Sequence, residues 1–398
     1  MRILIITNFP NRLDGGSAKG RFLYLGEMLC ERGHEVELIC SDFDHSKKQH
    51  RAEGSIKQEA YKTKITTLHE SGYPNNVSLK RLWSHFVWGI NVEKYLKKQK
   101  KPDVIYCAVP SLTAGVRAAR YCKKNSVRFV IDVQDLWPEA FQMAIKNKYL
   151  QKVFLPIKWY VDRIYCAADK IVAVSETYVE RVLAVNNKGD KGLCVFLGND
   201  GKLFDDSRGQ FRLPEIDSLR LAYIGNLSYS YDIPCVINAL KKYNKLKRTP
   251  SIKLLVMGDG DLRKEFEKEA NISNIDYEFT GSLPYPQMVS YLCCCDMVVN
   301  PIVSGSVASI INKVGDYALS GLPVINTQGS KEYRKLIEDY NSGINCKTGD
   351  ADDVENALEI LAKDIQLRKR MGKNARKLGV ERFDRRVTYK KLVEAVEK

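Results

Sequence analysis

Short runs of Ile, Val and Leu alternate with longer helical patterns along the whole chain. Six of these runs lie in the first half, at Ile3–Thr7, Val36–Cys40, Val104–Cys107, Val127–Val133, Ile171–Val174 and Leu193–Leu197. Five more lie in the second half, at Leu219–Ile224, Ile252–Met257, Asp276–Thr280, Met297–Val299 and Pro323–Ile325. Continuous apolar runs between helices are typical of parallel strands buried on both faces. The pattern predicts an α/β fold of two doubly wound parallel-sheet units, with ligands at the carboxyl ends of the strands.

A polar, glycine-rich stretch near Asn199 to Leu219 separates the two units. A chain of 398 residues also exceeds what one hydrophobic core usually supports. We therefore predict domains at 1–200 and 201–381, and we expect a final helix, about 382–398, to pack back on the first domain.

The apolar runs and the cysteines indicate the cellular compartment of the protein. No window of about 20 apolar residues is present, which excludes a transmembrane helix. Met1 leads directly into a strand-like run, so we expect no secretory signal. The 11 cysteines are scattered and lack zinc-type spacing, which indicates buried thiols in a reducing cytosol.

The formal charge of +15 is uneven, at +11 for residues 1–200 and +4 for 201–398. A basic first half attracts a polyanion, whether nucleic acid, anionic lipid or a phosphorylated acceptor. Two stretches in that half, 80–101 and 145–165, interleave Lys and Arg with Trp, Tyr and Phe. Such stretches suit binding to a membrane surface. The alternative is that they are domain-packing helices whose lysines face solvent.

The most informative segment runs from Ser304 to Asn326. It predicts a helix that begins beside Asn312 and Lys313, carries Asp316 one turn later and ends at Gly321. A helix N-terminus and a lysine attract a diphosphate, and a carboxylate accepts hydrogen bonds from ribose hydroxyls. The segment therefore suits a sugar nucleotide.

Two further turns of the second half follow predicted strands. Gly225 and Asn226 could cradle a phosphate with their amides. Ser282 and Leu283 lie in a loop fixed by prolines, which could present main-chain groups to a nucleobase edge and an apolar side chain to its face.

The first half offers two candidate regions. Gly15 and Gly16 follow the first strand, where backbone without a Cβ can approach a substrate; the alternative is a flexible connector. Lys19 and Arg21 come next on a helix and could face an acceptor phosphate, or only solvent.

The second region follows the strand that ends at Val133. Asp132, Gln134, Asp135 and Glu139 lie where an α/β sheet places its chemistry. A carboxylate or amide there could orient an acceptor hydroxyl or stabilise positive charge at a sugar carbon. The alternative is a capping cluster around a buried Trp137.

These motifs together resemble the GT-B glycosyltransferases of family 4, of the bacterial polysaccharide-assembly type. The resemblance rests on Gly15-Gly16, RGHEV, DVQDLWPEA, AVSETYVERV, LGND, YIGNLS, MGDGDL, FTGSLPYPQM and NKVGDYALSGLPVI, in the family's order. It implies two Rossmann-like domains facing each other across a cleft, an NDP-sugar held mainly by the second, and transfer with retention. It also implies no metal or other cofactor.

The resemblance implies roles for individual residues. The donor would contact Gly16, Gly225, Asn226, Ser282, Leu283, Ser309, Asn312, Lys313 and Asp316. The acceptor would contact Gly15, Lys19, Arg21, Asp132 and Glu139. Catalysis would involve Gln134, Asp135 and Lys313.

Three positions depart from the family pattern. Ala308 stands where a glutamate is common, so the sugar ring must be bound by other groups, such as Ser306, Ser309 or main chain. The Arg/Lys pair expected after YIGNLS is absent, which leaves Lys313 for the diphosphate. Gln134 stands where many members have histidine, so Asp135 is the nearest candidate base.

We therefore predict a cytoplasmic enzyme at the inner face of the plasma membrane. It would transfer a sugar from an NDP-sugar, UDP-linked in our interpretation, to a lipid-diphosphate-linked saccharide in bacterial surface polysaccharide assembly. The alternatives are a sugar-nucleotide epimerase of the same fold and an inactive binding protein. A nucleic-acid partner is not expected, because no recognition motif is present. The sequence leaves the sugar, the linkage and the oligomeric state open.

Overall fold

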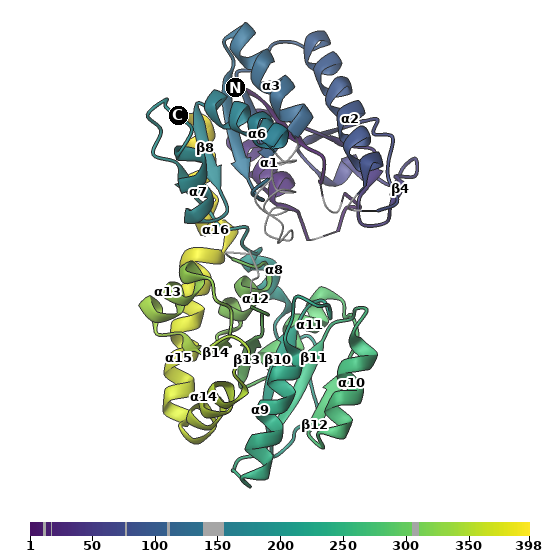
Figure 1. Ribbon diagram of the computed structural model, residues 1–398. Coiled ribbons are helices and arrows are strands. Elements are labelled where there is room, and N and C mark those ends of the chain that lie inside the picture. Colours follow the sequence, from purple (N-terminus) through teal and green to yellow (C-terminus); the bar gives the residue numbers. More distant parts are fainter. Residues whose placement is uncertain (11–12, 17, 76–77, 110–111, 138–154, 305–309) are drawn as a thin grey trace. The chain divides into compact units, whose positions relative to one another are not determined.

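The computed structural model describes residues 1–398 apart from 11–12, 17, 76–77, 110–111, 138–154 and 305–309. The chain divides into two compact units (Figure 1). The first unit comprises Met1–Phe196 and Tyr389–Lys398, and the second comprises Leu197–Thr388.

The first unit contains a seven-stranded parallel sheet with the order β5-β2-β1-β6-β7-β8-β9. Its strands are β1 (Arg2–Thr7), β2 (Glu35–Ser41), β5 (Lys64–Leu68), β6 (Val104–Val109), β7 (Arg128–Val133), β8 (Lys170–Ala173) and β9 (Leu193–Cys194). Its helices are α1 (Arg21–Glu31), α2 (Leu79–Lys98), α3 (Leu112–Asn125), α6 (Leu155–Ala167), α7 (Glu176–Leu183) and α17 (Lys390–Glu397), with a 3-10 turn at Gln58–Ala60. A short antiparallel hairpin pairs β3 (Phe43–Asp44) with β4 (Gln49–His50).

Alternate residues of β1 enter two different cores of this unit. Leu4 and Ile6 pack with side chains of α2, α3 and α6 on one face of the sheet. Ile3 and Ile5 pack on the other face with side chains of α1 and α17. Burial on both faces explains why the strand reads as a continuous apolar run.

The second unit contains a six-stranded parallel sheet with the order β12-β11-β10-β13-β14-β15. Its strands are β10 (Leu219–Ile224), β11 (Ile252–Met257), β12 (Asp276–Phe279), β13 (Met297–Asn300), β14 (Val324–Asn326) and β15 (Gly343–Asn345). Its helices are α8 (Gly201–Ser207), α9 (Ile233–Lys245), α10 (Arg263–Ile272), α11 (Tyr285–Cys293), α12 (Lys313–Ser320), α13 (Lys331–Tyr340), α14 (Ala351–Lys363), α15 (Ile365–Leu378) and α16 (Arg385–Thr388), with a π-helical turn at Gly379–Phe383.

Both sheets have the doubly wound strand order, and the predicted fold of two Rossmann-like parallel-sheet domains is confirmed. In such sheets ligands bind where the strand order reverses, at the carboxyl ends of the strands. In the second unit that point lies between β10 and β13, and in the first it lies between β1 and β6. The strands β5 and β15 and the β3–β4 hairpin were not predicted, because they are short or rich in polar residues.

The units begin and end at slightly different residues from those expected. The sequence suggested divisions after residues 200 and 381, whereas the structure divides the chain after Phe196 and Thr388. The backbone of Asn199 pairs with Phe383 and Arg385, which joins both connecting segments to the second unit.

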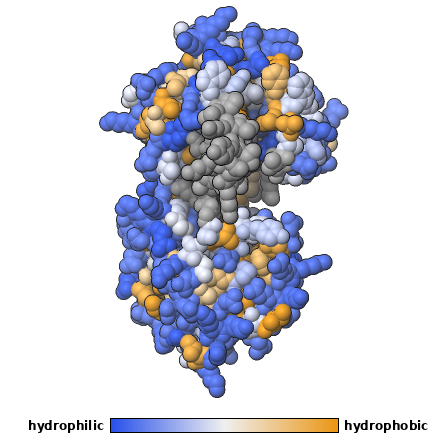
Figure 2. All heavy atoms as spheres, viewed as in Figure 1, coloured by the Kyte–Doolittle hydropathy of each residue, from blue (hydrophilic) through white to orange (hydrophobic). Residues whose placement is uncertain are grey.

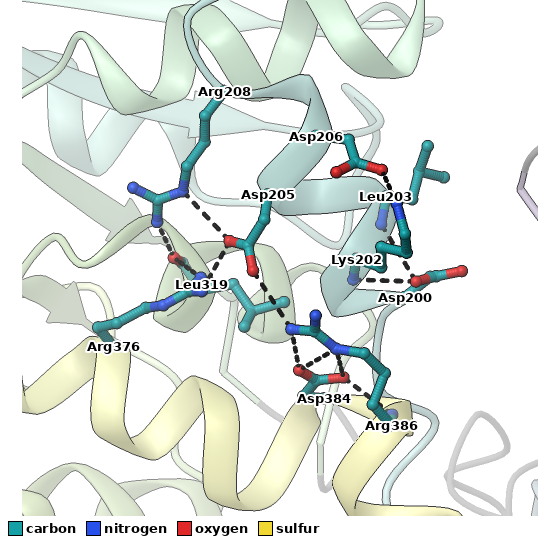
Figure 3. Close-up of polar contacts among 10 residues, drawn as sticks. All are labelled: Asp200, Lys202, Leu203, Asp205, Asp206, Arg208, Leu319, Arg376, Asp384 and Arg386. Atoms are coloured by element: carbon teal, nitrogen blue, oxygen red, sulfur yellow. Dashed lines mark hydrogen bonds and ion pairs between the residues drawn. The ribbon is translucent and has the colours of Figure 1, made fainter.

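An acidic side chain on α8 strengthens this attachment. Asp205 accepts hydrogen bonds from Arg376 of α15 at 2.6 Å and from Arg386 of α16 at 3.2 Å (Figure 3). Arg386 is also held by Asp384 at 2.6 Å. These charged contacts fix the segments that precede and follow the body of the second unit.

Candidate active site

Lys313 lies at the start of α12, beside the point where the strand order of the second sheet reverses. Its Nζ donates to the Tyr223 hydroxyl at 2.9 Å. The same ammonium lies 4.2 Å from the ring centroid of Tyr223 and 3.7 Å from that of Tyr231. Two aromatic rings and a hydroxyl therefore hold this cation in place.

The environment of Lys313 leaves its charge uncompensated. Within the described residues no ion pair involves Lys313, and burial lowers the pKa of its ammonium to about 7. A buried cation that lacks a carboxylate partner is costly on its own. An anionic ligand would remove that cost, which makes this a candidate site for a phosphate group.

Gly225 allows the close approach of Lys313 to the end of β10. Its φ of +126° suits glycine, and a Cβ there would lie 2.4 Å from Lys313 Nζ. Any side chain at this position would displace the lysine. Glycine is therefore favoured at position 225 for two reasons: its backbone amide can contact a phosphate, and it leaves room for Lys313.

Asp316 lies three residues further along α12, on the same face as Lys313. Its Oδ1 accepts hydrogen bonds from Tyr285 Oη and Asn199 Nδ2, both at 2.7 Å. The side chain is buried, and burial raises the pKa of its carboxyl to about 6, although both hydrogen bonds act in the opposite direction. No contact occupies Oδ2 within the described residues, so this oxygen can accept from a ligand hydroxyl.

The other donor candidates lie on the loops around these two residues. Asn226 and Asn312 are exposed, Ser282 is exposed and Leu283 is half-buried. Leu283 precedes α11, whose first residue Tyr285 contacts Asp316, so the loop is tied to the same region. Ser309 and the Ala308 position lie outside the described residues.

The opposite pKa shifts of Lys313 and Asp316 predict a bell-shaped pH dependence for UDP-sugar binding. The ammonium is charged below about pH 7 and the carboxylate is charged above about pH 6. Affinity should therefore fall as pH rises above about 7 and as it falls below about 6. Calorimetric titration with a UDP-sugar from pH 5 to pH 9 measures this.

The guanidinium of a Lys313→Arg variant stays charged from about pH 5 to about pH 9. In this variant the affinity for the UDP-sugar should no longer fall above about pH 7, but it should still fall below about pH 6. Equal affinity across the whole range in the wild type would contradict the assignment of both groups.

In the first unit, Arg21 and Asp132 bind each other in the interior. Arg21 Nε lies 2.6 Å from Asp132 Oδ2, and Arg21 Nη2 lies 3.2 Å from Oδ1. Tyr106 donates to the same carboxylate at 2.7 Å, and Arg21 donates to Tyr389 at 3.2 Å. The side chains of Arg21 and Asp132 are only 3% and 0% exposed. This burial is at odds with the predicted contact to an acceptor, and the two side chains form an ion pair in the interior of the unit instead.

Gln134 and Asp135 follow β7 and occupy different environments. Within the described residues the buried Nε2 of Gln134 has no hydrogen-bond partner, so it is a donor available to a ligand. Asp135 reaches solvent, yet nearby protein atoms raise the pKa of its carboxyl by desolvation, an effect that Arg81 partly offsets. A raised pKa brings a carboxyl closer to the range useful for proton transfer.

The remaining first-unit candidates have local partners. The amide of Gly15 donates to Tyr61 Oη at 2.8 Å, and the amide of Gly16 donates to Asp14 Oδ1 at 3.3 Å. Lys19 forms an ion pair with Glu27 at 3.2 Å. Glu139 lies outside the described residues. The roles of Gly15, Gly16 and Lys19 stay predictions.

The structure adds an aromatic and cationic cluster that the sequence did not reveal. Arg81 lies over the rings of Tyr73 and Trp137, at 5.6 and 5.3 Å from their centroids. His45 Nδ1 lies 2.5 Å from Tyr73 Oη, and Lys48 Nζ lies 5.0 Å from the same ring. These residues come from four separate segments, so only the fold brings them together. We call Tyr73, Arg81 and Trp137, with His45 and Lys48, the aromatic cluster.

Comparison with known proteins identifies the chain. Residues 21–191 match the model of Glycosyltransferase Family 4, and residues 207–378 match that of Glycosyl transferases group 1. The chain is a GT-B glycosyltransferase of family 4.

Individual relatives of this family 4 enzyme are distant. A Campylobacter jejuni protein, GalNAc-α-(1→4)-GalNAc-α-(1→3)-diNAcBac-PP-undecaprenol α-1,4-N-acetyl-D-galactosaminyltransferase, is 23% identical over 368 residues, which are 92% of this chain and 90% of that one. Anabaena HepE, solved with UDP, has a TM-score of 0.71 and 17% identity, with both chains fully covered. WaaG, a glycosyltransferase involved in lipopolysaccharide biosynthesis, has a TM-score of 0.64 and 13% identity, with 99% of each chain covered.

Proposed function

We propose that this enzyme transfers a sugar from a UDP-sugar, with retention of configuration, to a saccharide carried on a polyprenyl diphosphate. The product would serve the assembly of a bacterial surface polysaccharide. The observation that carries the donor half of the proposal is the half-buried ammonium of Lys313, which has no acidic partner within the described residues. It lies one helical turn from the carboxylate of Asp316.

Lys313 suits the diphosphate of a sugar nucleotide, and Asp316 suits its ribose. Lys313 and the amino end of α12 would neutralise the diphosphate as it leaves, because both direct positive charge to one place. Asp316 Oδ2 would accept from ribose hydroxyls, while Tyr285 and Asn199 hold Oδ1. No metal is required for this charge balance, in keeping with the family. The preference for UDP is supported by the UDP complex of Anabaena HepE.

The acceptor half of the proposal rests on the first unit. The rings of Tyr73 and Trp137 are buried and support Arg81, which would offer its cation to the acceptor diphosphate. Gln134 would supply an amide donor that has no partner within the described residues, and Asp135 would supply a carboxyl with a raised pKa. A lipid-linked acceptor is supported by the Campylobacter relative, whose name gives an undecaprenol-linked substrate.

A surface on the first unit would bring the enzyme to such an acceptor. The start of α2 exposes Leu79, Leu82, Trp83 and Phe86, and Figure 2 shows hydrophobic residues at the surface over this helix. On α6, Trp159 and Tyr160 are also exposed. Both helices pack against α3, and exposed aromatic residues on such helices suit insertion at a membrane interface. No helix of the described residues is long and apolar enough to cross a membrane.

Cations accompany these aromatic residues. A cavity of about 850 Å³ beside α3 and α6 is lined by Arg120, Lys123, Arg128, Arg163 and Lys188, among others. Arg163 stacks over Trp159, 4.3 Å from its ring centroid. The combination would attract anionic lipid headgroups.

Replacing Trp83 and Phe86 together by serine should weaken binding to anionic phospholipid vesicles at least about tenfold, because two apolar anchors are lost. Vesicle co-sedimentation measures the effect. Tyr229→Ser is the matched control, since Tyr229 is an exposed aromatic residue of the second unit. Equal vesicle binding by the double variant and the wild type would remove α2 from the membrane surface.

The proposed activity is tested by incubating the enzyme with UDP-sugars and a polyprenyl-diphosphate-linked saccharide, followed by mass spectrometry of the lipid fraction. A mass increase of one sugar, with the α-linkage assigned by NMR from an α-linked donor, is the expected result. Epimerisation of the UDP-sugar without acceptor would favour the epimerase alternative. Turnover of neither kind with any UDP-sugar, despite tight UDP binding, would favour an inactive binding protein.

A further inference from the structure

Three side chains with metal-binding atoms converge at the edge of the first unit, next to the β3–β4 hairpin. Asp42 follows β2, His50 ends β4 and His69 follows β5. Their ligand atoms all lie within 4.8 Å of one another. No other group of this kind occurs within the described part of the chain.

The distances within this group fit a tetrahedral metal. His69 Nδ1 lies 2.9 Å from Asp42 Oδ2, and His50 Nε2 lies 3.9 Å from Asp42 Oδ1. Nitrogen and oxygen ligands at about 2.0–2.1 Å from a tetrahedral Zn²⁺ lie about 3.3 Å from each other. The two separations from Asp42 fall on both sides of that value, and one imidazole would have to turn out of its stacked position to direct its nitrogen at the same ion as the other. The ring centroids of His50 and His69 lie 5.5 Å apart, and the two ring planes differ by 13°.

Surrounding contacts orient the ligands. Asp42 Oδ1 accepts from the amide of Glu70 at 2.8 Å, which fixes the carboxylate. The carbonyl of His69 accepts from Asn91 Nδ2 at 2.9 Å, which fixes the backbone of that ligand. His50 Nε2 lies 2.7 Å from the carbonyl oxygen of Glu70 and would exchange this partner for the metal. The first two contacts thus hold the Asp42 carboxylate and the His69 backbone in place whether or not an ion is bound.

We propose that Asp42, His50 and His69 bind one divalent transition-metal ion of the Zn²⁺ class. Two imidazoles and one carboxylate are ligands that this class of ion prefers, whereas Mg²⁺ and Ca²⁺ prefer oxygen alone. All three side chains reach solvent, so an ion can enter and water can complete the coordination.

The ion would clamp the hairpin onto the sheet. β3 and β4 pair over only two residues each, and the turn between them carries His45 and Lys48 of the aromatic cluster. Metal bonds from His50 on the hairpin to Asp42 and His69 at the strand ends would fix this turn. The ion would be bound by the first unit and would have no part in holding the donor diphosphate. Metal binding can therefore be measured without any glycosyltransferase activity, so its failure and that of the proposed function are distinguishable.

The test is titration of the untagged full-length protein with Zn²⁺, followed by calorimetry, and with Co²⁺, followed by absorption. The background carries Cys166→Ser, because Cys166 is an exposed thiol. We expect one Zn²⁺ per chain, a cobalt spectrum without a thiolate charge-transfer band, and a melting temperature that rises with added Zn²⁺.

Variants assign the ligands. His69→Ala and His50→Ala, made separately, should each weaken Zn²⁺ binding at least about tenfold. His34→Ala is the matched control, since His34 belongs to the same unit but pairs with Glu397; it should bind Zn²⁺ as the parent does. His69 is well exposed, so its replacement should leave the fold intact, which circular dichroism checks.

Two results would overturn the proposal. One is the lack of stoichiometric Zn²⁺ binding by the parent protein. The other is undiminished binding in both histidine variants, which would locate the ion elsewhere.

Discussion

Replacing Lys313 by alanine should lower kcat/KM for a UDP-sugar by about 100- to 1,000-fold, the usual effect of removing one preorganised group that stabilises developing charge. The lysine is half-buried between two tyrosines and has no acidic partner within the described residues, so its charge is available to a diphosphate. Affinity for UDP should fall in parallel, because the leaving group carries the same diphosphate. Steady-state kinetics and calorimetry measure the two effects.

Two further variants make this prediction specific. Gly225→Ala should act in the same direction, because its methyl group would displace the lysine. Lys331→Ala is the matched control, since Lys331 is an exposed lysine that begins another helix of the same unit; it should retain activity. Full UDP affinity in Lys313→Ala would exclude this lysine from the donor site.

The second large effect concerns stability. Arg21→Met should destabilise the first unit by about 3–5 kcal/mol, because it leaves the fully buried carboxylate of Asp132 without its cation. The pair is joined by two hydrogen bonds at 2.6 and 3.2 Å, so the loss is direct. Urea unfolding followed by a probe in the first unit measures it, since two units need not unfold together.

Lys19→Met is the control for this variant, because the ion pair of Lys19 with Glu27 is partly exposed and should contribute less than about 1 kcal/mol. Adding Asp132→Asn to Arg21→Met should restore part of the loss, since no buried charge then remains. An unchanged unfolding midpoint in Arg21→Met would show that the pair does not stabilise the unit.

Local patterns predicted much of the fold and the helix that carries Lys313 and Asp316. The helix from Lys313 ends at Gly321, whose φ of +76° is the left-handed conformation that suits a glycine after a helix. The apolar strand runs were correct because burial on both faces leaves a continuous signal. The sequence placed Lys313 and Asp316 one turn apart on one helix, and the structure has them so; their roles in donor binding stay predictions.

The sequence did not reveal the partners of Asp316, the Arg21–Asp132 pair or the aromatic cluster, because these contacts join segments far apart in the chain. Asn199 reaches Asp316 across 117 positions, and Arg21 reaches Asp132 across 111. Arg21 was expected to face an acceptor phosphate or solvent, because charged residues are mostly exposed. The aromatic cluster draws on four segments that no single motif spans. Tyr285 lay within a quoted motif, but only the fold shows its hydroxyl directed at Asp316.

The order in which the chain is made has a consequence for the first unit. Residues Tyr389–Lys398 belong to it, and Tyr389 contributes its hydroxyl to the buried contacts of Arg21. Those residues emerge from the ribosome only after the whole second unit has been synthesised. The core on the α1 face of the first sheet therefore stays incomplete until Tyr389–Lys398 have left the ribosome. A nascent chain that stops short of that point would present an apolar groove to chaperones and proteases.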